Sequence, residues 1–203
     1  MIDIAIIPAR GGSKRIPRKN IRLFCGRPMI YYSIFAAIES EQFSEVIVST
    51  DDEEIRDIAE SCGAKVPFLR PKELADDYAP TVPVIAHAIE TCEEIGWDVN
   101  YVACIYATAP FIEADDLRVA RKALGDNQIA YSFPVCEHAS PVQRALLVDE
   151  NNTASPMFPE NELVRTQDLP TAYFDAGQFY WGHKKAWKNN PNIHRHAKII
   201  DIP

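Results

Sequence analysis

The chain has 203 residues, of which 47% are hydrophobic and 25% are charged, a composition typical of one soluble domain with a sizeable core. Its 29 acidic residues outnumber its 21 basic ones, which argues against general nucleic-acid binding, for which a basic domain is expected. No apolar run approaches the roughly 20 residues of a membrane span, and the N-terminus lacks a signal pattern, so we expect a cytoplasmic protein without a membrane partner.

The first chemical feature is a basic segment that follows an apolar run. Residues 2–8 form an apolar run that only Asp3 interrupts, and such a run, continuous rather than alternating, is typical of a strand covered on both faces. Residues 10–27 then hold seven Lys or Arg and no acid, leaving 14 basic against 29 acidic residues elsewhere. Such a positive segment repels itself unless an anion binds there. Gly11 and Gly12 are expected to permit positive φ and close backbone approach, and Ser13 adds a hydroxyl, so the segment suits a polyphosphate.

Spacing excludes two common phosphate loops from this segment. No Gly-Lys-Ser/Thr closes a P-loop, and no G-x-G-x-x-G follows the strand. A solvated basic turn remains the alternative, because runs of charge are often simply exposed.

Strands and helices are then expected to alternate along the chain. The expected helices cover residues 28–38, 50–62, 81–92 and 114–125, and the expected strands cover residues 46–49, 65–69, 101–106 and 129–135. The second helix begins at a stretch with capping-box spacing, from Thr50 to Glu53. This alternation predicts an α/β fold, a three-layer αβα Rossmann-like domain with a mostly parallel sheet whose ligands bind at the carboxyl ends of the strands. The basic segment follows such an end.

Regular alternation stops at Cys136. Residues 137–170 contain prolines and no long period, although residues 145–152 look like half of a hairpin, so we expect an arm that projects from a single domain of residues 1–203. A strand-like stretch at 174–181, a short helix from His183 and a last strand at 197–202 follow.

The cysteines and histidines form no recognisable catalytic or zinc motif. The five cysteines are odd in number and lack C-x-x-C spacing, so we expect reduced core cysteines. We expect three of the histidines to be structural or exposed: His87, His194 and His196.

The stretch I-P-A-R-G-G-S-K-R-I-P-R-K-N-I resembles the signature that opens the cytidylyltransferases of nine-carbon acidic sugars, the CMP-sialic acid synthetase family with its pseudaminic and legionaminic acid relatives. The resemblance implies a nucleotide-diphospho-sugar transferase-like fold in which this loop holds the triphosphate of CTP. It implies CTP binding by Ala9, Arg10, Gly11, Gly12, Ser13, Lys14, Lys19 and Asn20. Among them, Arg10 and Lys19 would be catalytic cations that stabilise the departing pyrophosphate.

Two further stretches carry nucleotide contacts of the same family. F-L-R-P-K-E-L-A-D-D is similar to the family's R-P-x-x-L-A-x-D element and implies that Arg70 and Asp77 lie beside the nucleotide. Arg70 suits a cytosine carbonyl because a guanidinium is a fixed fork of donors, the alternative being a surface Arg before a turn. Y-A-T-A-P falls where the family has Q-P-T-S-P-L, implying Thr108 at the nucleotide and Tyr106 at the sugar, with a plain strand-to-helix turn as the alternative.

The C-terminal third carries the sugar-side elements. R-T-Q-D-L-P-T-A-Y matches the family's R-x-Q-x-L-P-x-A-Y element, and D-A-G-Q-F-Y resembles the pseudaminic acid branch most. Gln178 and Tyr180 would contact the sugar, because an amide both donates and accepts; the alternative is a polar residue at the rim of a sheet. Arg144 and Arg165 lie on or beside the arm, which in relatives crosses to a second subunit and helps to bind its acidic sugar. A homodimer is therefore expected.

The resemblance implies transfer of CMP from CTP to the anomeric hydroxyl of a nonulosonic acid, most specifically pseudaminic acid, with release of pyrophosphate and with Mg²⁺ as cofactor. Such transfer depends mostly on positioning and charge neutralisation, and no general base is evident. The family continues with an Asp-x-Asp stretch that holds Mg²⁺, whereas this sequence ends at Pro203, so no metal ligands are assigned. A sialic, legionaminic or eight-carbon Kdo-type transferase, and a nucleotide-binding protein without catalysis, remain alternatives.

Overall fold

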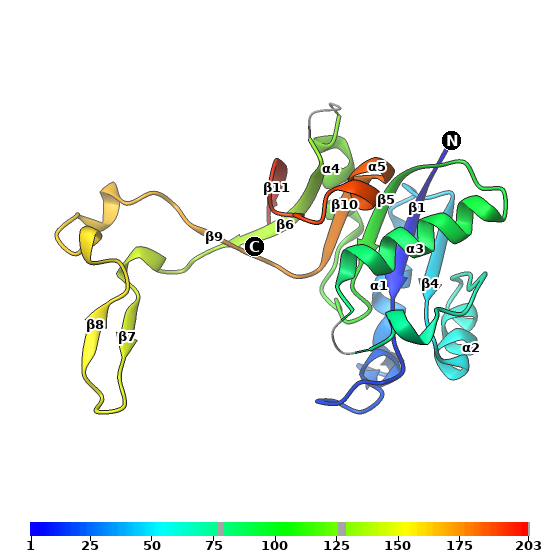
Figure 1. The fold of residues 1–203 in the computed structure, drawn as a ribbon, viewed down its shortest axis with the longest axis horizontal. Helices are drawn as coiled ribbons and strands as arrows, with labels where there is room; N and C mark the ends of the chain where they lie inside the picture. The colour runs from blue at the N-terminus through cyan, green and yellow to red at the C-terminus, as the bar shows by residue number, and fades with distance from the viewer. Residues whose placement is uncertain (77–78, 126–128, 203) are drawn as a thin grey trace. The chain divides into compact units, whose positions relative to one another are not determined.

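A computed structural model describes residues 1–76, 79–125 and 129–202 of the chain (Figure 1). The chain divides into two compact units. Unit 1 comprises Met1–Pro134 and Gly177–Ile200, and unit 2 comprises Val135–Ala176 and Asp201–Pro203. No helix within the described residues is long and apolar enough to cross a membrane.

A central sheet is built from seven strands, in the order β11-β6-β10-β5-β1-β4, with β9 paired to β6. Their bounds are β1 (Ile2–Pro8), β4 (Glu45–Ser49), β5 (Val99–Ile105), β6 (Tyr131–Glu137), β9 (Tyr173–Asp175), β10 (Phe179–His183) and β11 (Ala197–Asp201). β1 pairs in parallel with both β4 and β5, and β10 runs antiparallel to both β5 and β6. The strands β1, β4, β5 and β6 therefore share one direction, which confirms the prediction of a mostly parallel sheet.

Helices cover both faces of this sheet and complete the predicted three layers (Figure 1). Their bounds are α1 (Met29–Glu39), α2 (Glu53–Ser61), α3 (Thr81–Glu94), α4 (Ala114–Ala123) and α5 (Lys184–Asn189). α3 and α5 pack together against β5, while α1 packs against β1 and β4 with α2 and α4 beside it. The continuous apolar run of β1 is explained by this arrangement, because Ile4, Ala5, Ile6 and Ile7 are all fully buried.

Three sequence-based boundaries were wrong. The N-cap of α2 is Asp52 rather than Thr50, since the Asp52 carboxylate accepts a hydrogen bond from the Ile55 backbone N–H at 3.0 Å. The expected strand at 65–69 contributes only isolated bridges, from Lys65 to Ile47 and from Leu69 to Thr50. The stretch at 174–181 is two strands, β9 and β10, interrupted at Gly177, whose positive φ of 64° breaks the extended backbone.

The cysteines are only partly in the core. Cys92 and Cys104 are buried, and burial raises the pKa of the Cys92 thiol to about 12. Cys25 is exposed, and Cys62 and Cys136 are half-buried, so the prediction of core cysteines was wrong for these three.

Unit 2 contains the segment that was predicted as an arm, residues 137–170. Two short strands, β7 (Leu146–Val148) and β8 (Ala154–Pro156), pair as an antiparallel hairpin, which confirms the hairpin pattern seen at residues 145–152. Within unit 2, β9 pairs with the end of β6, where Phe174 lies opposite Cys136.

Candidate functional site

The basic segment is a loop that leaves the carboxyl end of β1 and is fastened at several backbone positions. The backbone N–H of Ala9 donates to the Ser49 carbonyl at 2.9 Å, which continues the β1–β4 pairing by one residue. Asn20 is buried, and its side-chain Nδ2 donates to the Arg10 carbonyl at 2.9 Å. The Gly11 N–H donates to an Asp51 carboxylate oxygen at 3.0 Å. The bonds to Ser49 and Asp51 hold the loop against the end of β4 and the turn that follows it, while the bond from Asn20 to Arg10 joins two parts of the loop.

The two glycines of the loop have different roles, and neither adopts the positive φ that was expected from the sequence. A Cβ on Gly11 would lie 2.5 Å from Oδ2 of Asp52, so no side chain fits there. A Cβ on Gly12 would meet nothing within 4 Å. Gly11 therefore serves close packing against a carboxylate, and the structure imposes no such need on Gly12.

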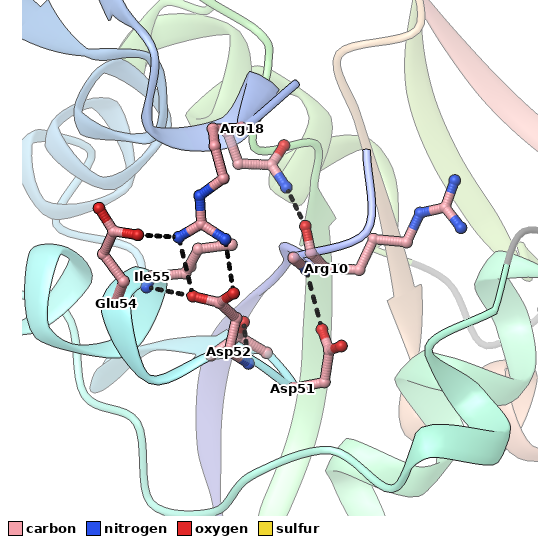
Figure 2. Close-up of polar contacts among 9 residues, drawn as sticks. Arg10, Arg18, Asp51, Asp52, Glu54 and Ile55 are labelled. Atoms are coloured by element: carbon pink, nitrogen blue, oxygen red, sulfur yellow. Dashed lines mark hydrogen bonds and ion pairs between the residues drawn. The ribbon is translucent and has the colours of Figure 1, made fainter. Parts of the chain in front are cut away.

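Arg18, one of the seven cations, pairs with carboxylates of the protein itself. Arg18 donates from Nη1 to Oδ2 of Asp52 at 2.6 Å and from Nη2 to Oδ1 of Asp52 at 3.0 Å, and it also pairs with Glu54 (Figure 2). The hydrogen bonds with Asp52 raise the pKa of Arg18 and hold the pKa of Asp52 below its usual range. The Arg10 side chain, in contrast, extends away from these carboxylates (Figure 2).

A cavity of about 710 Å³ opens beside the loop in unit 1. Its lining includes six of the residues predicted to bind CTP, together with one predicted to bind the sugar: Arg10, Ser13, Lys14, Lys19, Asn20, Arg70 and Tyr106. Sequence reasoning did not assign Arg15 or Thr81 to the site, although both line the cavity. Arg15 belonged to the counted cations, whereas Thr81 gave no signal beyond opening a helix.

The electrostatics of the cavity favour an anion. Burial lowers the pKa of Lys19, and the nearby charges of Arg15 and Arg10 lower it further. Within the part of the chain that the structure describes, Lys19 has no acidic partner. A bound polyanion would relieve both the repulsion and the lack of a counter-charge.

Arg70 is buried at 6% exposure, which rules out the alternative of a surface arginine. Its Nη1 donates to the Leu74 carbonyl at 3.2 Å and its Nη2 donates to the Ser49 carbonyl, while burial lowers its pKa. Its Nε is buried and has no hydrogen-bond partner among the described residues. Arg70 thus ties the segment after α2 to β4 at the wall of the cavity, and its contact with the base stays a prediction.

The sugar-side residues Tyr106, Gln178 and Tyr180 meet where β5 and β10 pair. The Tyr106 N–H donates to the Gln178 carbonyl at 2.9 Å, and the rings of Tyr106 and Tyr180 lie edge to face with centroids 5.6 Å apart. Gln178 Oε1 is a buried acceptor that has no partner among the residues described. Buried polar atoms are normally paired, so this oxygen is a candidate ligand contact.

Several predicted site residues are not brought to the cavity lining. Ala9 is buried and Thr108 half-buried outside it, and Asp77 lies outside the described residues. In unit 2, Arg144 donates from Nη1 to the Glu162 carbonyl at 2.6 Å and from Nη2 to the Val164 carbonyl. Arg165 is exposed and pairs with Asp168 at 2.7 Å.

Within the residues described, no group of three or more His, Cys, Asp or Glu side chains is placed to hold a metal ion. The cavity therefore offers cations rather than a carboxylate cluster. Its chemistry is that of an anion site, suited to neutralising a polyphosphate.

Comparison with known proteins identifies the family. The family model described as cytidylyltransferase matches residues 4–200. A pseudaminic acid cytidylyltransferase of Campylobacter jejuni subsp. jejuni serotype O:2 is 45% identical over 204 residues, covering 100% of this chain and 88% of that protein. A CMP-N,N'-diacetyllegionaminic acid synthase of Legionella pneumophila subsp. pneumophila is 36% identical over 64% of this chain and 57% of that protein.

The fold agrees with a solved structure of a CMP:2-keto-3-deoxy-manno-octonic acid synthetase complexed with CTP. The TM-score is 0.72 at 17% identity, over 98% of this chain and 89% of that one, which supports the nucleotide-diphospho-sugar transferase-like fold. Together with the basic cavity and the match over nearly the whole sequence, these findings show that the chain belongs to the cytidylyltransferase family.

Proposed function

We propose that this protein transfers CMP from CTP to the anomeric hydroxyl of pseudaminic acid and releases pyrophosphate, in the cytoplasm. The observation that carries the proposal is the cavity lined by Arg10, Lys14 and Lys19, in which Lys19 is partly buried beside other cations. The choice of sugar is supported by the relatives from two Campylobacter jejuni strains, at 45% and 43% identity, whose names carry that substrate.

The proposed reaction is a displacement at the α-phosphorus of CTP. The anomeric oxygen of the sugar forms a bond to this phosphorus, and the bond from phosphorus to the oxygen that bridges to the β-phosphate breaks. Pyrophosphate leaves with the electron pair, and the hydroxyl proton passes to solvent. Arg10 and Lys19 would stabilise the charge that grows on the leaving group, because fixed cations in a partly buried cavity need no reorganisation during the step.

The nucleotide side of the proposed site follows the cavity wall. Ser13, Lys14 and Asn20 lie on the loop, where a hydroxyl, an ammonium and an amide can donate to phosphate oxygens. The Nε–H of Arg70 has no partner among the described residues and is a candidate donor to a ligand, whereas Nη1 and Nη2 each donate to a backbone carbonyl. Contacts of Asp77 and Thr108 with the nucleotide remain part of the proposal.

The sugar side rests on Gln178. Its buried Oε1 has no partner among the described residues, and leaving such an acceptor unpaired costs about 1–3 kcal/mol. An acetamido N–H or a hydroxyl of the sugar would satisfy it, while the rings of Tyr106 and Tyr180 shape the adjoining surface. This energy corresponds to a preference of about tenfold to a hundredfold for a sugar that supplies the donor.

Mg²⁺ is proposed as a cofactor, although the side chains of the described residues do not fit a protein-built metal site. A hard cation prefers oxygen ligands and is commonly bound through substrate phosphates. The ion would therefore arrive with CTP. Loss of activity with a chelator and its recovery with added Mg²⁺ would test this.

A homodimer is also proposed, on the basis of the apolar surface of unit 2. Leu163 is 96% exposed, Val148 is 62% exposed and Leu146 is 60% exposed. Exposed apolar groups on one arm favour a partner surface, and Arg165 would act on the sugar of the second subunit. Sedimentation at micromolar concentration tests the dimer, and full activity of a monomer at nanomolar dilution would refute both the dimer and the role of Arg165.

The decisive experiment for the reaction is pyrophosphate release from CTP with a panel of sugars. We expect the highest rate with pseudaminic acid, a lower rate with N,N'-diacetyllegionaminic acid and the lowest with N-acetylneuraminic acid. Gln178→Ala should reduce this preference, whereas Gln42→Ala, which removes the same amide in the connection between α1 and β4, should not. If N-acetylneuraminic acid is the best substrate, or if Gln178→Ala leaves the ratios unchanged, the pseudaminic acid assignment is wrong.

A further inference from the structure

Arg18 and Asp52 connect the basic loop, which lines the cavity, to the turn before α2, which does not. Arg18 immediately precedes Lys19 in the basic loop, and Asp52 caps α2 through the Ile55 N–H. Both oxygens of Asp52 accept from the Arg18 guanidinium, at 2.6 and 3.0 Å (Figure 2). Arg18 does not line the cavity, although its neighbour Lys19 does.

We propose that the Arg18–Asp52 pair is a clasp that positions the basic loop so that its cations surround the triphosphate. This inference rests on the proposed function, because it assigns a task to residues that touch neither CTP nor the sugar. Arg18 and Asp52 are then positioning residues, and the charge of Arg18 serves the loop instead of the ligand.

The start of the loop, at Gly11, is held by the same turn that holds Arg18. The Gly11 N–H donates to Asp51, and Gly11 packs so closely on Asp52 that a Cβ would lie 2.5 Å from its Oδ2. One turn, at Asp51 and Asp52, therefore fastens the start of the loop at Gly11 and its end at Arg18. Residues between these points include Ser13 and Lys14, which line the cavity.

Backbone geometry and charge both require such a fastening. Arg18 has φ 54° and ψ 31°, a left-handed conformation that is unfavourable for a residue with a Cβ and that persists only where surrounding contacts enforce it. Lys19 and the other cations repel one another, which tends to open the loop when no anion is bound. The bidentate pair of Arg18 with Asp52 opposes both the backbone strain and the opening of the loop, because it fixes the orientation of the guanidinium as well as its distance from the carboxylate.

The main alternative is that Arg18 binds CTP directly once it leaves Asp52. The two roles predict opposite signs for Asp52→Asn. Removing a negative charge near a triphosphate site should tighten binding if Arg18 is a ligand that Asp52 restrains. Binding should instead weaken if the clasp positions the loop, even though the site becomes more positive. Asn is as good an N-cap as Asp, so α2 is preserved in this variant.

We would measure CTP binding by calorimetry, using the full chain and four variants. Asp52→Asn and Arg18→Asn should each raise the dissociation constant about three- to tenfold, the range for a partly exposed charge-assisted pair. Asn tolerates the left-handed backbone at Arg18. Arg18→Lys should recover part of the affinity, because it keeps one charged contact. Glu54→Gln, which alters only the exposed partner, should have the smallest effect.

Two additional measurements separate positioning from general stability. Hydrogen exchange at the Gly11 amide should be faster in Asp52→Asn and Arg18→Asn than in the native chain. The rate at saturating CTP should stay near the native value while KM for CTP rises, the pattern of lost binding that is uniform between ground and transition states. Thermal unfolding shows whether Asp52→Asn or Arg18→Asn has lost its fold. If one of them has, CTP binding by the other variant tests the clasp.

The outcomes distinguish the clasp from the function on which it rests. If native protein does not bind CTP, the proposed function fails and the clasp fails with it. If native protein binds CTP but Asp52→Asn binds it equally well or more tightly, only the clasp is refuted. The clasp is likewise refuted if folded Arg18→Asn protein binds CTP with the native affinity.

Discussion

Replacing Lys19 with Met is expected to stabilise the free protein and to weaken CTP binding at the same time. In the free protein, burial together with Arg15 and Arg10 lowers the pKa of Lys19, so its charged form is less favourable in the fold than in the unfolded chain. A group whose pKa is lowered on folding binds more protons when unfolded, so its charge opposes folding below its folded pKa, and stability rises as pH rises through it. Met keeps the apolar stem and removes the charge.

The two effects differ in size. Loss of a charge-assisted contact to phosphate should cost about 1.5–3 kcal/mol of binding free energy, which is about tenfold to 150-fold in the dissociation constant. The gain in the free energy of unfolding should stay below about 1 kcal/mol, because Lys19 is only partly buried and solvent screens its repulsion. Binding of CTP should also restore the pKa of Lys19, so the native complex should take up protons at alkaline pH.

Calorimetric titration with CTP, in buffers of different ionisation enthalpy, measures both the affinity and the proton uptake, and thermal unfolding measures the stability. Lys198→Met is the matched control, because it makes the same chemical change at an exposed position of β11 outside the cavity. We expect the control to leave CTP affinity near the native value. We interpret Lys19 as a cation that lacks an acidic partner among the described residues and binds the triphosphate. A Lys19→Met protein that is less stable than the native protein, or that binds CTP as tightly as the native protein does, would refute this interpretation.

Three further predictions concern the same loop. Gly11→Ala should lower the free energy of unfolding by about 1–3 kcal/mol in chemical denaturation, because its Cβ would meet Asp52 at 2.5 Å, whereas Gly12→Ala should be nearly neutral. Arg10→Ala should weaken CTP binding by about 1.5–3 kcal/mol in calorimetry, and unchanged affinity would remove Arg10 from the site. The pKa of Asp52 is lowered on folding, so its contribution to stability is present above its unfolded pKa and is lost as pH falls through its folded pKa; Asp52→Asn should therefore flatten the acid limb of a stability profile.

The sequence was sufficient to predict the layers, the strand β1 and the position of the basic loop, because these follow from local periodicity and composition. It was not sufficient to predict that Arg18 pairs with an acidic side chain whereas, among the residues described, its neighbour Lys19 does not. Of these two neighbours in one basic run, Asp52 pairs with Arg18 and not with Lys19. That pairing exists because the crossover from β1 to β4 brings residue 52 beside residue 18. The requirement for glycine at position 11 was equally hidden from the sequence. It arises from close packing on Asp52, which is distant along the chain, and not from a positive φ at Gly11.

The order of the strands explains why the residues predicted to bind the nucleotide and the sugar lie close together. Local sequence patterns could not predict this order. β10 is inserted antiparallel between β5 and β6, which places Gln178 next to Tyr106 although they are 72 residues apart in sequence. Because β1 and β5 are parallel, with Ile6 opposite Cys104, the start of the basic loop and Tyr106 lie at the same edge of the sheet. The triphosphate loop and the amide therefore come from different strands that meet only after the sheet has formed. Changes at the start of β10 should consequently alter the choice of sugar without disturbing the loop that binds CTP.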